Sequence, residues 1–318
     1  MAGPTTTHHS NPLVAVILAV LYAPIALLIA LNHYRLATLA RRIETWTQPP
    51  DWFLQPAARL VLAISPIKCD TRLLRRDCDK VFYVSNHQLL ALELPAMYMA
   101  IYLHTGKVPR GVLDRIHLKI PLWADYLVFC GAVHGDAASV ESAMRKSHPL
   151  LVFPGGHLEV YKKRNEPPYP LHWKNRSGFA KLAIRHGYTI VPTSGIGFGN
   201  MLHILGEVQD PGVMKYVFHD SREHISVPLC VPVAFETQYI RFGPPIETAA
   251  LNGRDDDADA VWEIRERTRL AVAEGLEALQ RYRKQDHTRS ITSGALRRLK
   301  ALFHGNSRAF ALSITAGP

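Results

Sequence analysis

The first long apolar stretch of the chain runs from Pro12 to Leu31 and contains no charged residue. Twenty residues of α-helix rise about 30 Å, which is the thickness of a bilayer core. Pro24 would kink this helix, and transmembrane helices tolerate such kinks. The pattern predicts a transmembrane helix over residues 12–31, preceded by a short tail, residues 1–11. A cleaved signal peptide or a buried core helix is the alternative, although the basic segment that opens a signal peptide is missing.

Basic residues flank this stretch on one side. No Lys or Arg precedes it, whereas Arg35, Arg41 and Arg42 follow it. Segments next to a membrane span carry an excess of Lys and Arg when they lie in the cytoplasm. The distribution therefore predicts a single-pass membrane protein with the rest of the chain on the cytoplasmic side.

A second apolar stretch, residues 46–67, is interrupted by four prolines and is too broken to span a bilayer. Its two tryptophans, Trp46 and Trp52, would suit the headgroup region of a membrane. We expect residues 32–80 to form helices that either lie in the membrane interface or pack against a globular domain.

Short apolar runs and helical periodicity alternate along the next part of the chain. The apolar runs predict strands at residues 81–85, 150–153, 188–193, 227–234 and 239–242. The periodic segments predict helices at residues 89–103, 176–186 and 259–283. Prolines 228 and 232 would confine the fourth strand to a sheet edge. This alternation predicts an α/β fold: a single αβα domain with a central mixed sheet over residues 81–250. A C-terminal helix within residues 251–289 should pack on that domain.

The last segment, residues 290–318, is a basic tail. Apolar residues between Leu296 and Phe303 are interleaved with Arg and Lys. This pattern is typical of a short amphipathic helix on anionic lipid, and a disordered charged tail is the alternative.

The composition narrows the functional class. Hydrophobic residues make up 47% of the chain, so a sizeable core is possible, and the formal net charge is +10. Such charge suits anionic lipid, an anionic cosubstrate or nucleic acid. No helix-turn-helix or aromatic-rich sheet pattern supports nucleic-acid binding. The four cysteines form no CxxC pair and no cluster with zinc-ligand spacing, so we expect no metal.

The sharpest local feature follows the first predicted strand: Asn86 and His87, with Glu93 six residues later. Binding and reacting groups lie at the carboxyl ends of strands in α/β folds. A carboxylate that reaches back to the imidazole would fix its tautomer, and a free imidazole accepts a proton near neutral pH. Taken alone, a surface His beside an unrelated Glu explains the pattern better.

Two further segments add to this feature. A Pro154-Gly155-Gly156 turn follows the strand at residues 150–153, and Glu159 lies just beyond it. Glycines let a backbone approach a ligand closely and can expose N–H groups to an anion. Arg176 and Lys181 flank the expected start of a helix and could bind phosphates there.

Taken in order, these blocks resemble the glycerolipid acyltransferase superfamily, which includes lysophosphatidate acyltransferase. The resemblance rests on Asn86-His87 after an apolar strand, Phe-Pro-Gly-Gly, the Gly-Phe-x-Lys-Leu-Ala helix and Ile-Val-Pro, between about Val81 and Ile246. It implies a membrane-bound O-acyltransferase that moves a fatty acyl group from acyl-CoA or acyl carrier protein to a glycerolipid hydroxyl, without a metal or a covalent acyl-enzyme. It implies His87 as general base supported by Glu93. By the same likeness the substrate would contact Asn86, Pro154, Gly155, Gly156, Glu159, Arg176 and Lys181.

Two departures from the usual pattern bear on the acceptor. The acid usually follows the His at the position of Leu92, whereas here it is Glu93, one place later. Pro-Gly-Gly-His-Leu-Glu stands in place of Pro-Glu-Gly-Thr-Arg, whose Arg is thought to hold the acceptor phosphate in lysophosphatidate enzymes. Both departures resemble the diacylglycerol and monoacylglycerol acyltransferase-like branch and favour a more neutral acceptor.

Other interpretations remain. A lysophosphatidate or lysophospholipid acyltransferase is one, and an inactive lipid-binding homologue whose Glu93 cannot support His87 is another. An esterase lacks its usual G-x-S-x-G turn. Lys107, Arg110 and Lys119 could face donor phosphates or headgroups but fit solvated surface better, and His134 and His157 fit structural roles.

Overall fold

The computed structural model describes residues 12–64, 67–74, 76, 79–120, 122–161, 166–209, 226–232, 237–287 and 289. By their internal contacts, residues 1–46 and residues 47–318 form two units, and each is described by itself. Both predicted tails, residues 1–11 and 290–318, fall outside the described residues.

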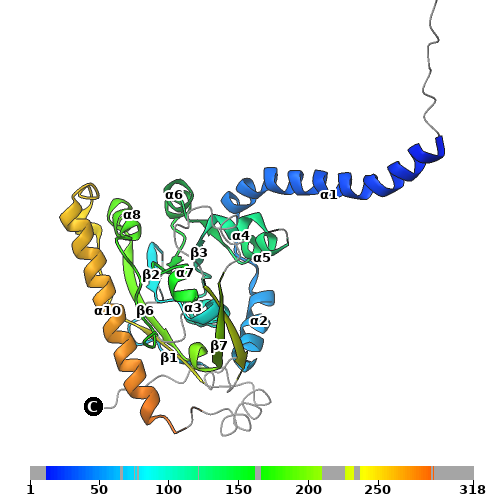
Figure 1. The fold of residues 1–318 in the computed structure, drawn as a ribbon. Helices are drawn as coiled ribbons and strands as arrows, with labels where there is room; N and C mark the ends of the chain where they lie inside the picture. Colours follow the sequence, from blue (N-terminus) through cyan, green and yellow to red (C-terminus); the bar gives the residue numbers. More distant parts are fainter. Residues whose placement is uncertain are drawn as a thin grey trace, which may run out of the picture. The chain divides into compact units, whose positions relative to one another are not determined.

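The first unit contains one long helix, α1 (Pro12–Glu44), drawn in blue in Figure 1. Its segment Tyr22–Glu44 is long and apolar enough to cross a membrane, judged by length and composition. The helix does not end at Leu31, where the apolar run stops, but continues to Glu44. Residues 32–44 contain neither Pro nor Gly and are rich in Leu, Ala and Arg, which are strong helix formers.

The second unit is built on a seven-stranded sheet with the order β1-β9-β6-β2-β5-β3-β4. Its strands are β1 (Ile67–Asp70), β2 (Val81–Ser85), β3 (Arg110–Leu113), β4 (Val133–His134), β5 (Leu150–Val152), β6 (Thr189–Ile196) and β9 (Gln238–Phe242). All neighbouring pairs are parallel except β6 and β9. This is an α/β fold with a mostly parallel, mixed sheet, as predicted.

Helices cover both faces of the sheet, so successive side chains of β2 are buried in two different cores. Phe82 and Val84 join a core that includes residues of α6 (Ala137–Arg145), α8 (Gly178–His186) and α10 (Ala258–Gln285). Tyr83 lies in a second core, on the other face, with residues of α2 (Asp51–Ile64) and α3 (Leu94–Thr105). Figure 1 shows α8 and α10 side by side along one flank. The layering is therefore αβα.

Short elements complete the second unit. They are α4 (Arg115–Lys119), α5 (Trp123–Phe129), α7 (His157–Val160) and the 3₁₀ turns Leu89–Ala91, Phe198–Asn200 and Ala249–Leu251. The antiparallel pair β7 (Leu202–Gln209) and β8 (Ser226–Pro232) stands apart from the main sheet. The proline-containing strand β8 pairs in the described residues with β7 alone, which agrees with its predicted edge position.

Two segments differ from the predictions. Strand β1 lies in the region where only helices were expected, and it joins the same sheet as the strands beyond residue 81. The predicted helix 89–103 is broken into a 3₁₀ turn and α3, with Leu90 and Ala91 at φ values of 56° and 55°. That left-handed conformation is unfavourable for residues with a Cβ, so the surrounding contacts must hold it.

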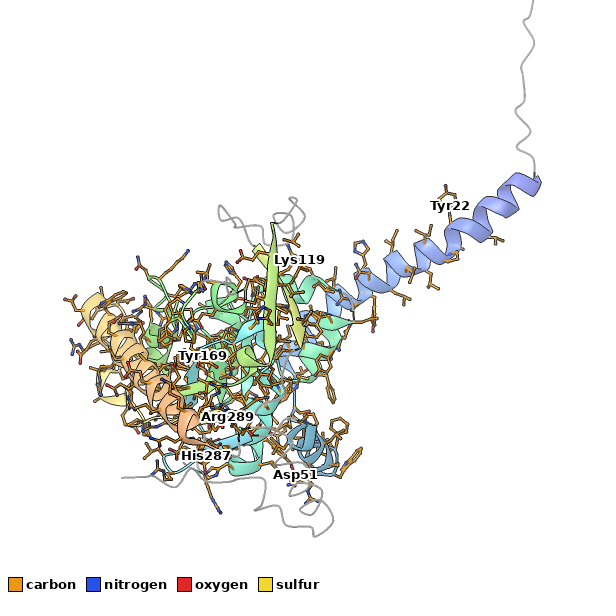
Figure 2. All side chains as sticks on the ribbon, turned by 60° about the horizontal axis from the view of Figure 1, so that its bottom comes forward. Tyr22, Asp51, Lys119, Tyr169, His287 and Arg289 are labelled. Atoms are coloured by element: carbon orange, nitrogen blue, oxygen red, sulfur yellow. The ribbon has the colours of Figure 1, made fainter. Side chains whose placement is uncertain are left out.

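Helix α2 packs against the domain, which is one of the two alternatives that the sequence left open. Leu54, Ala58 and Leu62 are buried at a spacing of four residues. Trp52 and Phe53 of the same helix are exposed. This helix begins at Asp51, labelled in Figure 2, whose carboxylate accepts a hydrogen bond from the Tyr102 hydroxyl (2.8 Å).

Candidate active site

His87 lies at the carboxyl end of the central strand β2, between the parallel neighbours β5 and β6. Its ring stacks on Phe153, which directly follows β5, with the ring centres 3.9 Å apart and the planes 16° from parallel. The position agrees with the rule that reacting groups collect at the carboxyl ends of parallel strands.

The Glu93 carboxylate reaches His87, as the sequence predicts. Glu93 Oε1 lies 2.7 Å from His87 Nδ1, and Glu93 is fully buried. The break in the predicted helix turns residue 93 inward, whereas Leu92 is 40% exposed. The acid therefore stands one place later than in the usual pattern because position 92 faces outward here.

This pair can do acid–base chemistry. A neutral imidazole whose Nδ1–H donates to a buried carboxylate keeps Nε2 as a proton acceptor. The carboxylate also stabilises the imidazolium that forms when Nε2 takes a proton. A pair of this kind can accept a proton through Nε2 of the imidazole.

The side chain of Asn86 does not face the cavity. It is fully buried, its Nδ2 donates to Gly195 O (3.0 Å), and its Oδ1 accepts from Gly195 N (2.9 Å). Asn86, expected among the substrate-binding residues, instead ties the end of β2 to β6. Gln88, which sequence reasoning did not single out, acts similarly: its Oε1 accepts from Phe198 N (2.9 Å).

The Pro154-Gly155-Gly156 turn lies beside His87 and meets Arg176. Arg176 Nη1 donates to Pro154 O (2.6 Å), and a Cβ on Gly156 would lie 3.0 Å from the same nitrogen. Gly156 has a φ of 52°, which favours glycine. The structure thus brings together four of the residues that the sequence assigned to the substrate: the three of the turn and Arg176.

Glu159 lies behind this turn with both carboxylate oxygens occupied. Oε2 accepts from the backbone N–H of His87 (2.7 Å), and Oε1 accepts from that of His172 (2.9 Å). Burial raises the pKa of Glu159 to about 7, although the two N–H groups act in the opposite direction. The charge of nearby Glu93 raises this pKa further, and Arg176 lowers it.

Lys181 lies away from this group. It forms an ion pair with Asp256 (2.7 Å), with 42% and 86% of the two side chains exposed. Lys181 therefore does not contact the other predicted site residues.

A cavity of about 210 Å³ opens beside His87. Its polar lining includes Gln88, Glu159, Glu166 and Tyr169 (labelled in Figure 2), and its apolar lining includes Leu89, Leu202 and Ile204. Strand β7 thus forms part of the wall. Sequence reasoning missed this wall because nothing local to β7 indicates its distant neighbour.

The remaining candidates are used elsewhere. His134 pairs with Asp136, which caps α6, and Lys107 pairs with Asp79. Arg110 is buried and donates to the backbone oxygen of Gly131 (3.2 Å). Within the described ranges, no group of three or more His, Cys, Asp or Glu residues could hold a metal ion.

Comparisons with known proteins indicate the family of the domain that contains this site. Residues 68–195 match the family model Acyltransferase. The chain is 24% identical to phytyl ester synthase 1, chloroplastic, of Arabidopsis thaliana over 68% of its length, and 32% identical to a Bos taurus DGAT1/2-independent enzyme synthesizing storage lipids over 35%. It spans 34% and 32% of these two relatives.

A solved structure is also similar, that of the 1-acyl-sn-glycerophosphate acyltransferase PlsC from Thermotoga maritima. The match has a TM-score of 0.42 and 14% identity, and it covers 80% of this chain and 95% of that one. A score this low does not by itself establish a common fold. The family model and the order of the matching blocks identify residues 68–195 as an acyltransferase domain of the glycerolipid acyltransferase superfamily.

Proposed function

We propose that this protein is a membrane-bound O-acyltransferase that moves a fatty acyl group from acyl-CoA or acyl carrier protein to a hydroxyl of a neutral glycerolipid. The observation that carries the proposal is the 2.7 Å pair between His87 Nδ1 and the buried Glu93 carboxylate, beside the cavity. Burial of a carboxylate is unfavourable unless the carboxylate is paired, so this contact differs from that of a solvated surface His beside an unrelated Glu.

The proposed reaction is a single transfer. The acceptor hydroxyl oxygen attacks the thioester carbonyl carbon while His87 Nε2 takes the hydroxyl proton. The tetrahedral intermediate collapses, the carbon–sulfur bond breaks, and the imidazolium returns the proton to the leaving sulfur. An ester and a free thiol result, and His87 ends in its starting state. Glu93 keeps the tautomer and stabilises the imidazolium between the two proton transfers.

The cavity supports a neutral acceptor. The lining carboxylates, Glu159 and Glu166, are acidic, and the described lining contains no Lys or Arg. A phosphate would therefore meet like charge instead of a basic partner. Leu158 occupies the place where the usual pattern has Arg. The names of the two relatives refer to storage lipids and to a phytyl ester.

The test offers membranes that contain the protein an acyl-CoA labelled in its acyl chain, with one of five acceptors: monoacylglycerol, diacylglycerol, a long-chain alcohol, lysophosphatidate or a lysophospholipid. We expect ester formation with a neutral glycerolipid, at a kcat/KM about tenfold or more above that with lysophosphatidate, because of the charge of the cavity. Preference for lysophosphatidate would contradict the neutral acceptor. Preference for the long-chain alcohol would mean that the acceptor is not a glycerolipid but an alcohol of the class that the name phytyl ester synthase indicates.

The donor phosphates require basic groups outside the cavity. Arg176 is exposed and lies just before α8, whose first turn carries no acidic side chain. A helix start with a nearby guanidinium suits a phosphate. Arg176 is therefore the proposed donor-binding residue. Lys181 is not, because Asp256 neutralises its charge.

An aromatic surface supports membrane contact by the second unit. It consists of exposed Trp52 and Phe53 on α2 and of Trp123, Tyr126 and Phe129 on α5. The rings of Phe53 and Phe129 join the helices, with centres 5.6 Å apart. Exposed Arg59 lies on α2, and exposed Lys119 ends α4, which contacts α5 (Lys119 is labelled in Figure 2). Aromatic side chains with basic neighbours are typical of a surface at lipid headgroup depth.

Tryptophan quenching tests this surface. In phosphatidylcholine–phosphatidylglycerol vesicles with brominated acyl chains, we expect the Trp52→Phe and Trp123→Phe variants each to lose part of the quenched fluorescence. The matched control is Trp262→Phe, because Trp262 is 44% exposed on α10, which covers the other core. Its removal should leave the amount of quenched fluorescence unchanged. Equal quenching in the unmodified protein and both surface variants would exclude this contact.

A further inference from the structure

Glu159 connects α7 with two other segments, the one after β2 and the loop at His172. Its side chain starts on α7, and its two oxygens accept the backbone N–H groups of His87 and His172 at 2.7 and 2.9 Å. Glu159 is only 2% exposed. Because the bond to His87 is made by the backbone, it places the residue itself and leaves the imidazole ring to Glu93. A charged acceptor of two N–H groups makes bonds about twice as strong as neutral ones.

Gly155 leaves the space that this carboxylate occupies. A Cβ built on Gly155 would fall on the carboxyl carbon of Glu159. The backbone of Gly155 does not need glycine, since its φ lies outside the left-handed region that applies to Gly156. Position 155 therefore lacks a side chain because the Glu159 carboxylate needs the space, and not because of the backbone conformation of the turn.

We propose that Glu159 is a positioning residue, whose ionised carboxylate holds the His87 backbone in register with the cavity, and that Gly155 lacks a side chain to admit that carboxylate. This inference rests on the proposed function, because it assumes that His87 is the base. It gives Glu159 a different role from the substrate contact that the sequence suggested.

Several charged groups act on this carboxylate. Glu93, on the segment after β2, raises its pKa, and Arg176, on the segment before α8, lowers it. His87 and Glu166 line the same cavity, and the His172 ring pairs with Glu166. Burial dominates and raises the pKa of Glu159 from 4.5 to about 7. On protonation, one oxygen becomes a hydroxyl and a much weaker acceptor, so one of the two N–H bonds weakens.

Activity and stability should then change in opposite directions with pH. Between about pH 4.5 and 7 the folded protein binds a proton at Glu159 more tightly than the unfolded chain does. Its contribution to stability therefore falls as the pH rises through this range. Activity rises over the same range, since ionised Glu159 holds His87 in place. A neutral side chain at position 159 should remove this group from both profiles.

The experiment uses the full-length protein in membranes with the variants Glu159→Gln, Glu159→Ala, Gly155→Ala and Gly155→Ala/Glu159→Ala. We expect Glu159→Gln to lower kcat about 10- to 100-fold with KM nearly unchanged, as misplacement of a reacting group does. The acid limb of its pH profile should lose one ionisation. Gly155→Ala should be similarly impaired, because its Cβ would overlap the Glu159 carboxyl carbon. Added to Glu159→Ala, the same change should lower kcat by less than about twofold further, because the carboxylate that needs the space is gone. Glu277→Gln, on the exposed face of α10, is the control.

The outcomes separate this inference from the proposed function. If the unmodified protein transfers acyl groups and Glu159→Gln retains its kcat and pH profile, Glu159 does not position His87. A Gly155→Ala variant that folds, by its thermal unfolding transition, and keeps full activity also overturns the inference, as does an equally large further loss when Gly155→Ala is added to Glu159→Ala. If the unmodified protein transfers no acyl group to any of the five acceptors, the proposed function itself fails.

Discussion

Replacing His87 by Ala is expected to lower kcat for acyl transfer about 10²- to 10⁴-fold, the contribution of a positioned general base. Binding of acyl-CoA should persist, because the donor phosphates are expected to contact Arg176 instead of the imidazole. The measurement is label transfer from acyl-CoA to the preferred acceptor, together with equilibrium binding of the donor on the same membranes.

Removal of His87 also leaves the buried Glu93 carboxylate without its partner, which destabilises proteins by several kcal/mol. The companion variant His87→Gln reduces this problem, because its amide N–H₂ can donate to Glu93 but cannot accept a proton at neutral pH. We expect it to be equally inactive while it unfolds closer to the unmodified protein. Lys181→Ala, which loses a surface ion pair with Asp256, is the control and should retain activity. Full activity in the folded His87→Gln variant would remove His87 from the mechanism.

Replacing Glu93 by Gln should lower kcat by about 10²- to 10⁴-fold as well, with little change in KM. A Gln amide carries no charge to stabilise the imidazolium, and when its N–H₂ donates to His87 Nδ1 the ring proton moves to Nε2, which leaves no acceptor for the hydroxyl proton. The size of the side chain is unchanged, so the effect reports the tautomer and the charge. Steady-state rates at several pH values measure it.

A variant that moves the acid to the usual position tests the assignment of Glu93 further. The variant Leu92→Asp/Glu93→Leu carries its acid where the usual pattern has it, but position 92 is 40% exposed in this fold, whereas position 93 is buried. We expect this variant to be as inactive as Glu93→Gln. If it were active, the turn at Leu90 and Ala91 would not determine the spacing, and the assignment of Glu93 would be wrong.

The sequence predicted those elements best whose pattern is local. Strands β2, β5, β6 and β9 and the helix α10 were recognised within a few residues, because each combines a short apolar run or a regular period with turn residues at its ends. The αβα layering followed from their alternation. The break between Leu89 and Leu94 was missed, because two residues with a Cβ in the left-handed region depend on contacts that the local pattern does not include.

The site was predictable only in part. The reach of Glu93 to His87 could be inferred from spacing and family likeness. The sequence offered no means to distinguish residues that face the cavity from residues that hold it, so Asn86, Glu159 and Lys181 were grouped with substrate contacts. Asn86 proves to bond Gly195, 109 residues away, and Glu159 bonds the backbone of His87, 72 residues away. Such partners depend on the register between strands.

By itself, therefore, the sequence determined the class of this protein: an α/β domain of the glycerolipid acyltransferase superfamily, with a base candidate after a buried strand and one apolar helix near its N-terminus. Only the tertiary structure decided what the side chains of Asn86 and Glu159 bond to, why Gly155 has no side chain, and which strand encloses the cavity. The physical reason is that apolar periodicity and turn preferences act over a few residues. Hydrogen bonds and close packing in the site join segments that only the sheet brings together.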